Sequence, residues 1–128
     1  MRYLLDTHLL LWTAMGSPRL KPSAAAIIED TQNELNFSAA SIWEIAIKNS
    51  QGRDSFAVDP AILRDGLIAN GMTELAISAA HACATDALPM LHNDPFDRML
   101  IAQATAEGMT LLTSDTAVAD YRGPVRKV

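Results

Sequence analysis

Five acidic residues stand where a parallel sheet would bring side chains together: Asp6, Glu44, Asp94, Asp97 and Asp115. Asp6 and Asp115 each follow a short apolar run, whereas the other three lie near the starts of expected helices. Because the carboxyl ends of parallel strands open on one edge of a sheet, four of the five could converge there. Carboxylates that close repel one another, and clusters of oxygen ligands suit Mg²⁺ or Mn²⁺. The positions therefore indicate metal-assisted chemistry.

Glu44 also has a purely structural interpretation. Ser41 and Glu44 match the spacing of a helix capping box, and Glu44 precedes Lys48 by one helical turn, which favours an ion pair. On a helical wheel Glu44 falls opposite Ile42 and Ile45, so periodicity alone predicts that it faces solvent. Its place early in a helix that directly follows a strand is what favours a role at the sheet edge.

The other acids differ in how well structure alone explains them. Asp94 is a natural N-cap before a proline, Asp97 would favour the dipole of the same first turn, and Asp115 could cap a short helix. Asp6 has the weakest structural interpretation, because it directly follows two leucines and precedes a second apolar run. We therefore expect Asp6 to be functional.

Strand-like and helix-like stretches alternate along the whole chain, which is typical of parallel strands joined by helical crossovers. The expected strands are 2–6, 34–38, 73–75, 109–113 and 125–128. The expected helices are 7–14, 23–33, 39–50, 60–70, 78–87, 94–107 and 116–121. We therefore expect one α/β domain over residues 1–128, with a four- or five-stranded parallel sheet flanked by helices on both faces.

Composition is consistent with a small soluble domain with an aliphatic core. Of the 128 residues 49% are hydrophobic, 20% charged and only 5% aromatic. The net charge of −5 argues against a general nucleic-acid binder, unless acids that hold cations invert the local field. The single cysteine, Cys83, excludes an internal disulfide, fits a reducing cytoplasm, and is expected to be buried. Asp6 and His8 interrupt the N-terminal apolar run, so neither a signal peptide nor a membrane span is expected.

Other side chains that often carry chemistry form no recognisable pattern. His8, His81 and His92 show no paired metal-ligand spacing, so a structural role is expected for each. Trp12 and Trp43 are expected in the core or at a subunit contact. The sequence has neither a glycine-rich phosphate loop nor a nucleophile elbow.

Four motifs occur together and in register, at residues 4–8 (LLDTH), 40–45 (ASIWEI), 92–98 (HNDPFDR) and 112–115 (LTSD). The set closely resembles PIN-domain proteins, specifically the VapC-type toxins of bacterial toxin–antitoxin pairs, over essentially the whole chain. Residues 94–104 are the most specific match. The resemblance implies a PIN-like α/β/α sandwich and a metal-dependent ribonuclease. Its acidic quartet would be Asp6, Glu44, Asp97 and Asp115.

The same resemblance assigns supporting positions around the quartet, at Thr7, Asp94, Arg98, Thr113 and Ser114. Thr7 and either Thr113 or Ser114 would line the site with hydroxyl groups, and Asp94 would cap a helix beside it. One or two Mg²⁺ or Mn²⁺ ions held by the quartet would lower the pKa of bound water and supply hydroxide for hydrolysis of an RNA phosphodiester.

A net-acidic protein needs local positive charge to hold RNA. The candidate phosphate contacts are Arg19, Lys21, Lys48, Arg53 and Arg98. Asn93 and Ser114 depart from the family pattern, which often has a basic residue there, and the turn 52–55 adds a negative charge. The resemblance further implies a cytoplasmic homodimer or larger toxin–antitoxin assembly, inhibited by an antitoxin segment over the acidic cleft, and no membrane partner.

Other classes of protein could place an acid after the first strand. A phosphohydrolase of the haloacid-dehalogenase type needs a second acid two residues after the first, where this chain has His8. A receiver-like phosphoacceptor needs paired acids after the first strand and a late lysine, and neither is found at the matching positions. A PIN-like protein-interaction module without catalysis is the remaining alternative.

Overall fold

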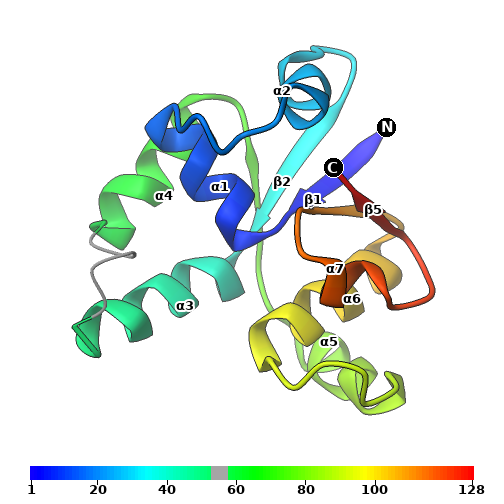
Figure 1. Cartoon of the computed structure of the whole chain (residues 1–128). Helices are drawn as coiled ribbons and strands as arrows, with labels where there is room; N and C mark the ends of the chain where they lie inside the picture. The colour runs from blue at the N-terminus through cyan, green and yellow to red at the C-terminus, as the bar shows by residue number, and fades with distance from the viewer. Residues whose placement is uncertain (53–57) are drawn as a thin grey trace.

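The computed structural model describes residues 1–52 and 58–128, which form a parallel sheet between two layers of helices (Figure 1). The strands are β1 (Arg2–Leu5), β2 (Glu34–Ser38), β3 (Thr73–Leu75), β4 (Thr110–Thr113) and β5 (Val125–Lys127). Their spatial order is β3-β2-β1-β4-β5, and every pairing is parallel. The expected α/β fold with a five-stranded parallel sheet is therefore confirmed, and β1 occupies its centre.

The helices are α1 (Thr7–Met15), α2 (Pro22–Glu29), α3 (Ala39–Ser50), α4 (Pro60–Ala69), α5 (Ala79–Ala84), the 3₁₀ turn η2 (Thr85–Ala87), α6 (Pro95–Glu107) and α7 (Thr116–Ala119). The helix expected at 23–33 ends early, because the Asp30 carboxylate accepts the N–H of Gln32 at 2.9 Å and turns the chain. The helix expected at 78–87 divides at Thr85, whose hydroxyl donates to the Ala82 carbonyl oxygen.

The sheet places one buried cluster on each face. Successive side chains of a strand point to opposite faces, so Leu5 and Leu112 join the cluster under α1, α3 and α4. Leu4 and Leu111 join the other cluster, under α6 and α7. All four leucines are fully buried, and this burial fixes the register of β1 against β4.

Two side chains expected inside the protein lie outside it. Cys83 is exposed, because the short helix α5 buries only His81. Trp43 is 58% exposed, so it is not a core residue, and its alternative place at a subunit contact stays a prediction. Trp12 packs against the core cluster as expected. No helix among residues 1–52 and 58–128 is long and apolar enough to cross a membrane.

Candidate active site

Asp6 and Asp115 leave two neighbouring strands at the same edge of the sheet. The N–H of Asp6 donates to the Leu112 carbonyl oxygen at 3.1 Å, which continues the pairing of β1 with β4. Thr113 connects the two acids. Its hydroxyl donates to Asp6 Oδ2 at 2.6 Å and accepts the N–H of Asp115 at 3.0 Å. The predicted convergence of these strand ends is therefore present.

Asp6 is 4% exposed and also serves as the N-cap of α1. Its Oδ1 accepts the N–H of Leu9 at 2.9 Å, so it has the structural role that its sequence context did not suggest. Burial raises the pKa of Asp6, although hydrogen bonds from Thr113 and from the backbone at Leu9 and Ser114 oppose that rise. A buried carboxylate at a sheet edge results.

Glu44 is only 3% exposed, so its expected solvent-facing position is wrong. The helical wheel fails because α3 packs this face against the start of α1. The Thr7 hydroxyl donates to Glu44 Oε1 at 2.7 Å and lies 2.9 Å from Ser41 Oγ. Lys48 Nζ donates to Glu44 Oε2 at 2.7 Å, which confirms the expected ion pair.

The predicted capping box at the start of α3 is also wrong. The side chain of Ser38, not of Ser41, caps this helix by accepting the N–H of Ala40. Ser41 therefore lies inside the helix, beside Thr7. Glu44 is consequently held by contacts with α1 and with its own ion-pair partner.

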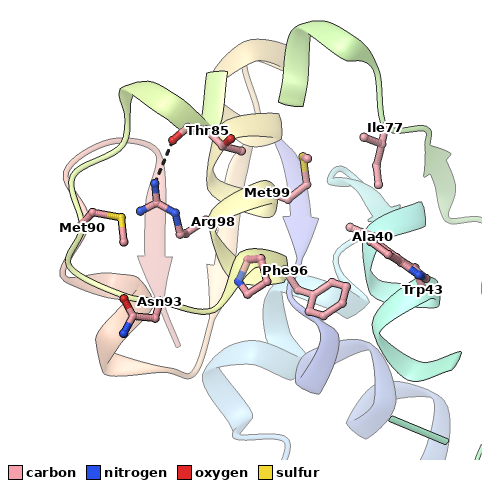
Figure 2. Close-up of a pocket in the computed structure, with 10 residues that line it drawn as sticks. Ala40, Trp43, Ile77, Thr85, Met90, Asn93, Phe96, Arg98 and Met99 are labelled. Atoms are coloured by element: carbon pink, nitrogen blue, oxygen red, sulfur yellow. Dashed lines mark hydrogen bonds between the residues drawn. The ribbon is translucent and has the colours of Figure 1, made fainter. Parts of the chain in front are cut away.

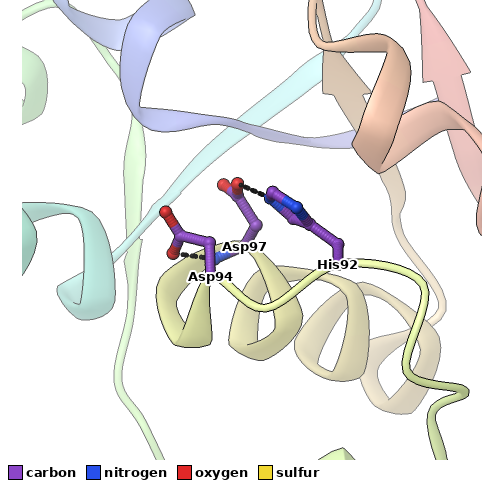
Figure 3. A group of neighbouring side chains, drawn as sticks. All are labelled: His92, Asp94 and Asp97. Carbon is purple, nitrogen blue, oxygen red and sulfur yellow. Dashed lines mark hydrogen bonds and ion pairs between the residues drawn. The ribbon is translucent and has the colours of Figure 1, made fainter.

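Asp97 projects from the first turn of α6 beside His92 and Asp94 (Figure 3). Asp97 Oδ2 lies 2.8 Å from His92 Nε2, and Asp94 Oδ1 caps the helix by accepting the N–H groups of Phe96 and Asp97. Burial raises the pKa of Asp97 to about 6; the bond from His92 opposes this rise, and the negative charges of Asp94 and Glu44 add to it. The charge of Glu44 on α3 therefore acts on Asp97 on α6.

Among the residues that the structure describes, one group of three offers ligand atoms within 4.8 Å of one another: His92, Asp94 and Asp97. Asp115 is exposed and caps α7 by accepting the N–H of Ala117 at 2.8 Å. The acids therefore share one edge of the sheet without closing around a single point. Sequence reasoning gave His92 only a structural role, and its place five residues before Asp97 was the signal that could have identified it.

Arg98 lies on a different face of α6 from Asp97, because one residue turns a helix by about 100°. Its guanidinium donates to the carbonyl oxygens of Thr85, Leu88 and Pro89, at 3.0, 3.4 and 2.9 Å. Figure 2 shows the bond to Thr85. These bonds hold the chain before α6, and the role expected for Arg98 beside the acids stays a prediction.

A cavity of about 290 Å³ lies between α3 and the start of α6 (Figure 2). Trp43 and Phe96 meet in its wall edge to face, with their ring centroids 5.2 Å apart. Each of these aromatic residues directly precedes an acid of the predicted quartet. An apolar hollow therefore adjoins the acidic edge.

The candidate RNA contacts are spread over several elements. Arg19 and Lys21 are exposed in the connection between α1 and α2. Lys48 lies at the acidic edge because it is paired with Glu44. Arg53, with most of the turn 52–55, lies outside the described residues.

Thr113→Val should destabilise the protein by about 1–3 kcal/mol, because the buried Asp6 carboxylate and the N–H of Asp115 lose the hydroxyl that joins them. Urea unfolding measures this change. Thr113→Ser keeps the hydroxyl and is the matched control, expected to lie nearer the parent protein. Equal unfolding midpoints for the valine and serine variants would contradict the assigned link between Asp6 and Asp115.

This arrangement of strands and acids matches a known family. The family model described as "PIN domain" matches residues 3–124 of this chain. The chain therefore belongs to the PIN-domain family, and the resemblance inferred from its motifs is confirmed.

Individual relatives agree with this placement. The chain is 31% identical over 122 residues to Ribonuclease VapC22 of Mycobacterium tuberculosis, an alignment that covers 94% of this chain and 92% of the relative. The structure of VapBC2 from Rickettsia felis, solved with promoter DNA, aligns with a TM-score of 0.72 at 15% identity. The alignment covers 100% of this chain and 99% of the VapBC2 chain. DNA-bound VapBC from Salmonella typhimurium aligns with a TM-score of 0.66 at 14% identity, and the alignment covers 100% of this chain and 97% of the VapBC chain. The identities of 15% and 14% to these two solved structures show a shared fold alone.

Proposed function

We propose that this protein is a metal-dependent ribonuclease toxin that hydrolyses RNA phosphodiester bonds and is inhibited by a cognate antitoxin. The observation that carries the proposal is the acidic edge at the carboxyl ends of the strands: Asp6 and Glu44 are buried there, and the charge of Glu44 acts on the partly buried Asp97. The ribonuclease named among its relatives supports the same activity. The chain would act as a single PIN domain over residues 1–128.

The donor set of this edge fits a hard divalent cation. Its side chains offer carboxylate oxygens, and a cation would offset both the burial and the negative charges of Asp94 and Glu44 that raise the pKa of Asp97. Asp6 and Asp97 would be the principal ligands, Asp115 would bind directly or through water, and Glu44 would bind or orient the attacking water. When bound, one or two Mg²⁺ or Mn²⁺ ions would lower the pKa of water and neutralise charge on the phosphoryl oxygens.

The remaining residues of the edge would position the reacting groups. The Thr113 hydroxyl orients Asp6 through a hydrogen bond of 2.6 Å, and the Thr7 hydroxyl orients Glu44 through one of 2.7 Å. Lys48 would hold a substrate phosphate near Glu44, and Arg19 and Lys21 would contact the RNA farther away. The net charge of −5 makes such local contacts necessary.

Protein partners are proposed on the basis of exposed apolar side chains, which are costly to leave in water. The largest are Met1, Met15, Trp43, Ile62, Ile68, Ile77, Met90 and Leu91. One structural neighbour, from Klebsiella pneumoniae, is described as a toxin–antitoxin complex, which supports an antitoxin partner here. A cytoplasmic homodimer, or a larger assembly with antitoxin, would cover these surfaces.

Sequencing of RNA ends after induced expression tests the activity. The parent protein should create new ends, and Asp6→Asn should create none, although asparagine can still cap α1 and so preserve the fold. Asp59→Asn makes the same change at the cap of α4, away from the acidic edge, and should cut like the parent. Identical RNA ends with the parent and Asp6→Asn would leave the non-catalytic interaction module as the better description.

A further inference from the structure

We infer that His92 is a positioning residue for the proposed reaction: its imidazole fixes the Asp97 carboxylate, and Tyr121 fixes His92 in turn. The inference rests on the proposed function only in treating Asp97 as a ligand of the catalytic metal. Neither His92 nor Tyr121 belongs to the acidic quartet. His92 acts on the quartet from the loop before α6, and Tyr121 acts from the segment after α7.

The contact between His92 and Asp97 is short and shielded. Nε2 lies 2.8 Å from Oδ2, and the two side chains are 23% and 18% exposed. An ionised carboxylate only accepts hydrogen bonds, so Nε2 carries the proton that it donates. The bond therefore occupies one oxygen of Asp97 and leaves the other for a cation.

A buried tyrosine anchors the backbone of His92, from which the imidazole extends. The Tyr121 hydroxyl donates to the His92 carbonyl oxygen at 3.2 Å and accepts the His92 N–H at 3.1 Å. It also accepts a hydrogen bond from Arg98 Nη1 at 3.0 Å. A hydroxyl has one proton and two lone pairs, so each is used. Tyr121 belongs to the core cluster under α6, which makes this anchor rigid.

His92 could instead be a direct metal ligand, since one of its ligand atoms lies within 4.8 Å of those of Asp94 and Asp97. The geometry favours positioning, because the nitrogen that donates to Asp97 cannot also coordinate a cation. Outer partners that hydrogen-bond to ligating carboxylates commonly orient them and tune metal affinity. His92 occupies such a position.

Three variants of the full chain separate these roles. His92→Gln places an amide donor near the former Nε2 and can still hold Asp97, whereas His92→Leu has no donor. Calorimetric titration with MnCl₂ should show affinity about tenfold weaker for His92→Leu and close to the parent for His92→Gln. RNA cleavage should show the same order in kcat, with KM nearly unchanged. Tyr121→Phe should have a smaller effect in the same direction and add little to His92→Leu.

Each outcome decides the inference. Equal loss of Mn²⁺ affinity in His92→Gln and His92→Leu would overturn it, because the imidazole would then be a ligand. Unchanged affinity in His92→Leu, or no Mn²⁺ binding by the parent, would also overturn it. A parent that binds Mn²⁺ with the expected ranking of variants but cleaves no RNA would support the positioning role and defeat only the proposed function.

Discussion

Asp97→Asn is expected to stabilise the metal-free protein while removing most of its RNA cleavage. Burial, with the charges of Asp94 and Glu44, raises the pKa of Asp97 to about 6 from 3.8 in an unfolded chain. Ionising Asp97 therefore costs more in the folded protein, and stability falls as pH rises from about 4 through 6. Asparagine removes this cost but keeps an oxygen that can accept the bond from His92.

The expected gain is about 1–3 kcal/mol at pH 8 in chelator and close to zero below pH 4, measured by urea unfolding at both pH values. Cleavage should fall on the order of 100-fold or more, the size found when one group that stabilises a transition state is lost. Asp120→Asn, at an exposed position, is the control and should change stability by less than about 0.5 kcal/mol. A less stable Asp97→Asn protein at pH 8 would contradict the crowding of negative charge around Asp97.

Arg98→Met is expected to destabilise the protein by about 2–4 kcal/mol. Its guanidinium donates to three carbonyl oxygens of residues 85–89 and to the Tyr121 hydroxyl, and methionine would leave these acceptors without it. The same segment leads to His92, so a loosened loop should also lower Mn²⁺ affinity. Thermal and urea unfolding measure the first effect, and calorimetry measures the second.

Arg64→Met is the matched control for this effect. Arg64 forms an ion pair with the carboxylate of Glu74, but both side chains are substantially exposed. Its loss should shift the urea midpoint far less than the loss of Arg98, because solvent screens surface pairs. Arg98→Lys should recover only part of the stability, since a lysine cannot spread its donors across the same carbonyls. Greater destabilisation by Arg64→Met than by Arg98→Met would contradict this ranking.

The features that sequence predicted correctly depend on local rules. Asp94 caps α6 because a carboxylate before Pro95 can reach the free N–H groups of the first turn. The strands β1 and β4 were recognisable as short apolar runs, and alternation with helices was enough to predict a parallel sheet, although only the structure shows that these two strands are adjacent. Asp6 and Asp115 followed from the ends of these strands.

The features that sequence missed depend on packing between distant elements. A helical wheel treats α3 alone, so it could not show that Thr7 of α1 would cover Glu44. Arg98 adjoins Asp97 in sequence, but the carbonyl groups that it holds come from a loop whose path was unknown. Tyr121 meets His92 from a segment 29 residues away, and no local pattern signals that contact.

The most direct test of the account is cleavage of end-labelled RNA by the purified protein after chelation and return of Mg²⁺ or Mn²⁺. Cleavage by the parent should disappear with the metal and return with it. Asp6→Asn should stay inactive under both conditions, whereas Asp59→Asn should follow the parent. Cleavage that persists in chelator, or equal cleavage by the parent and Asp6→Asn, would contradict a metal-dependent ribonuclease at this acidic edge.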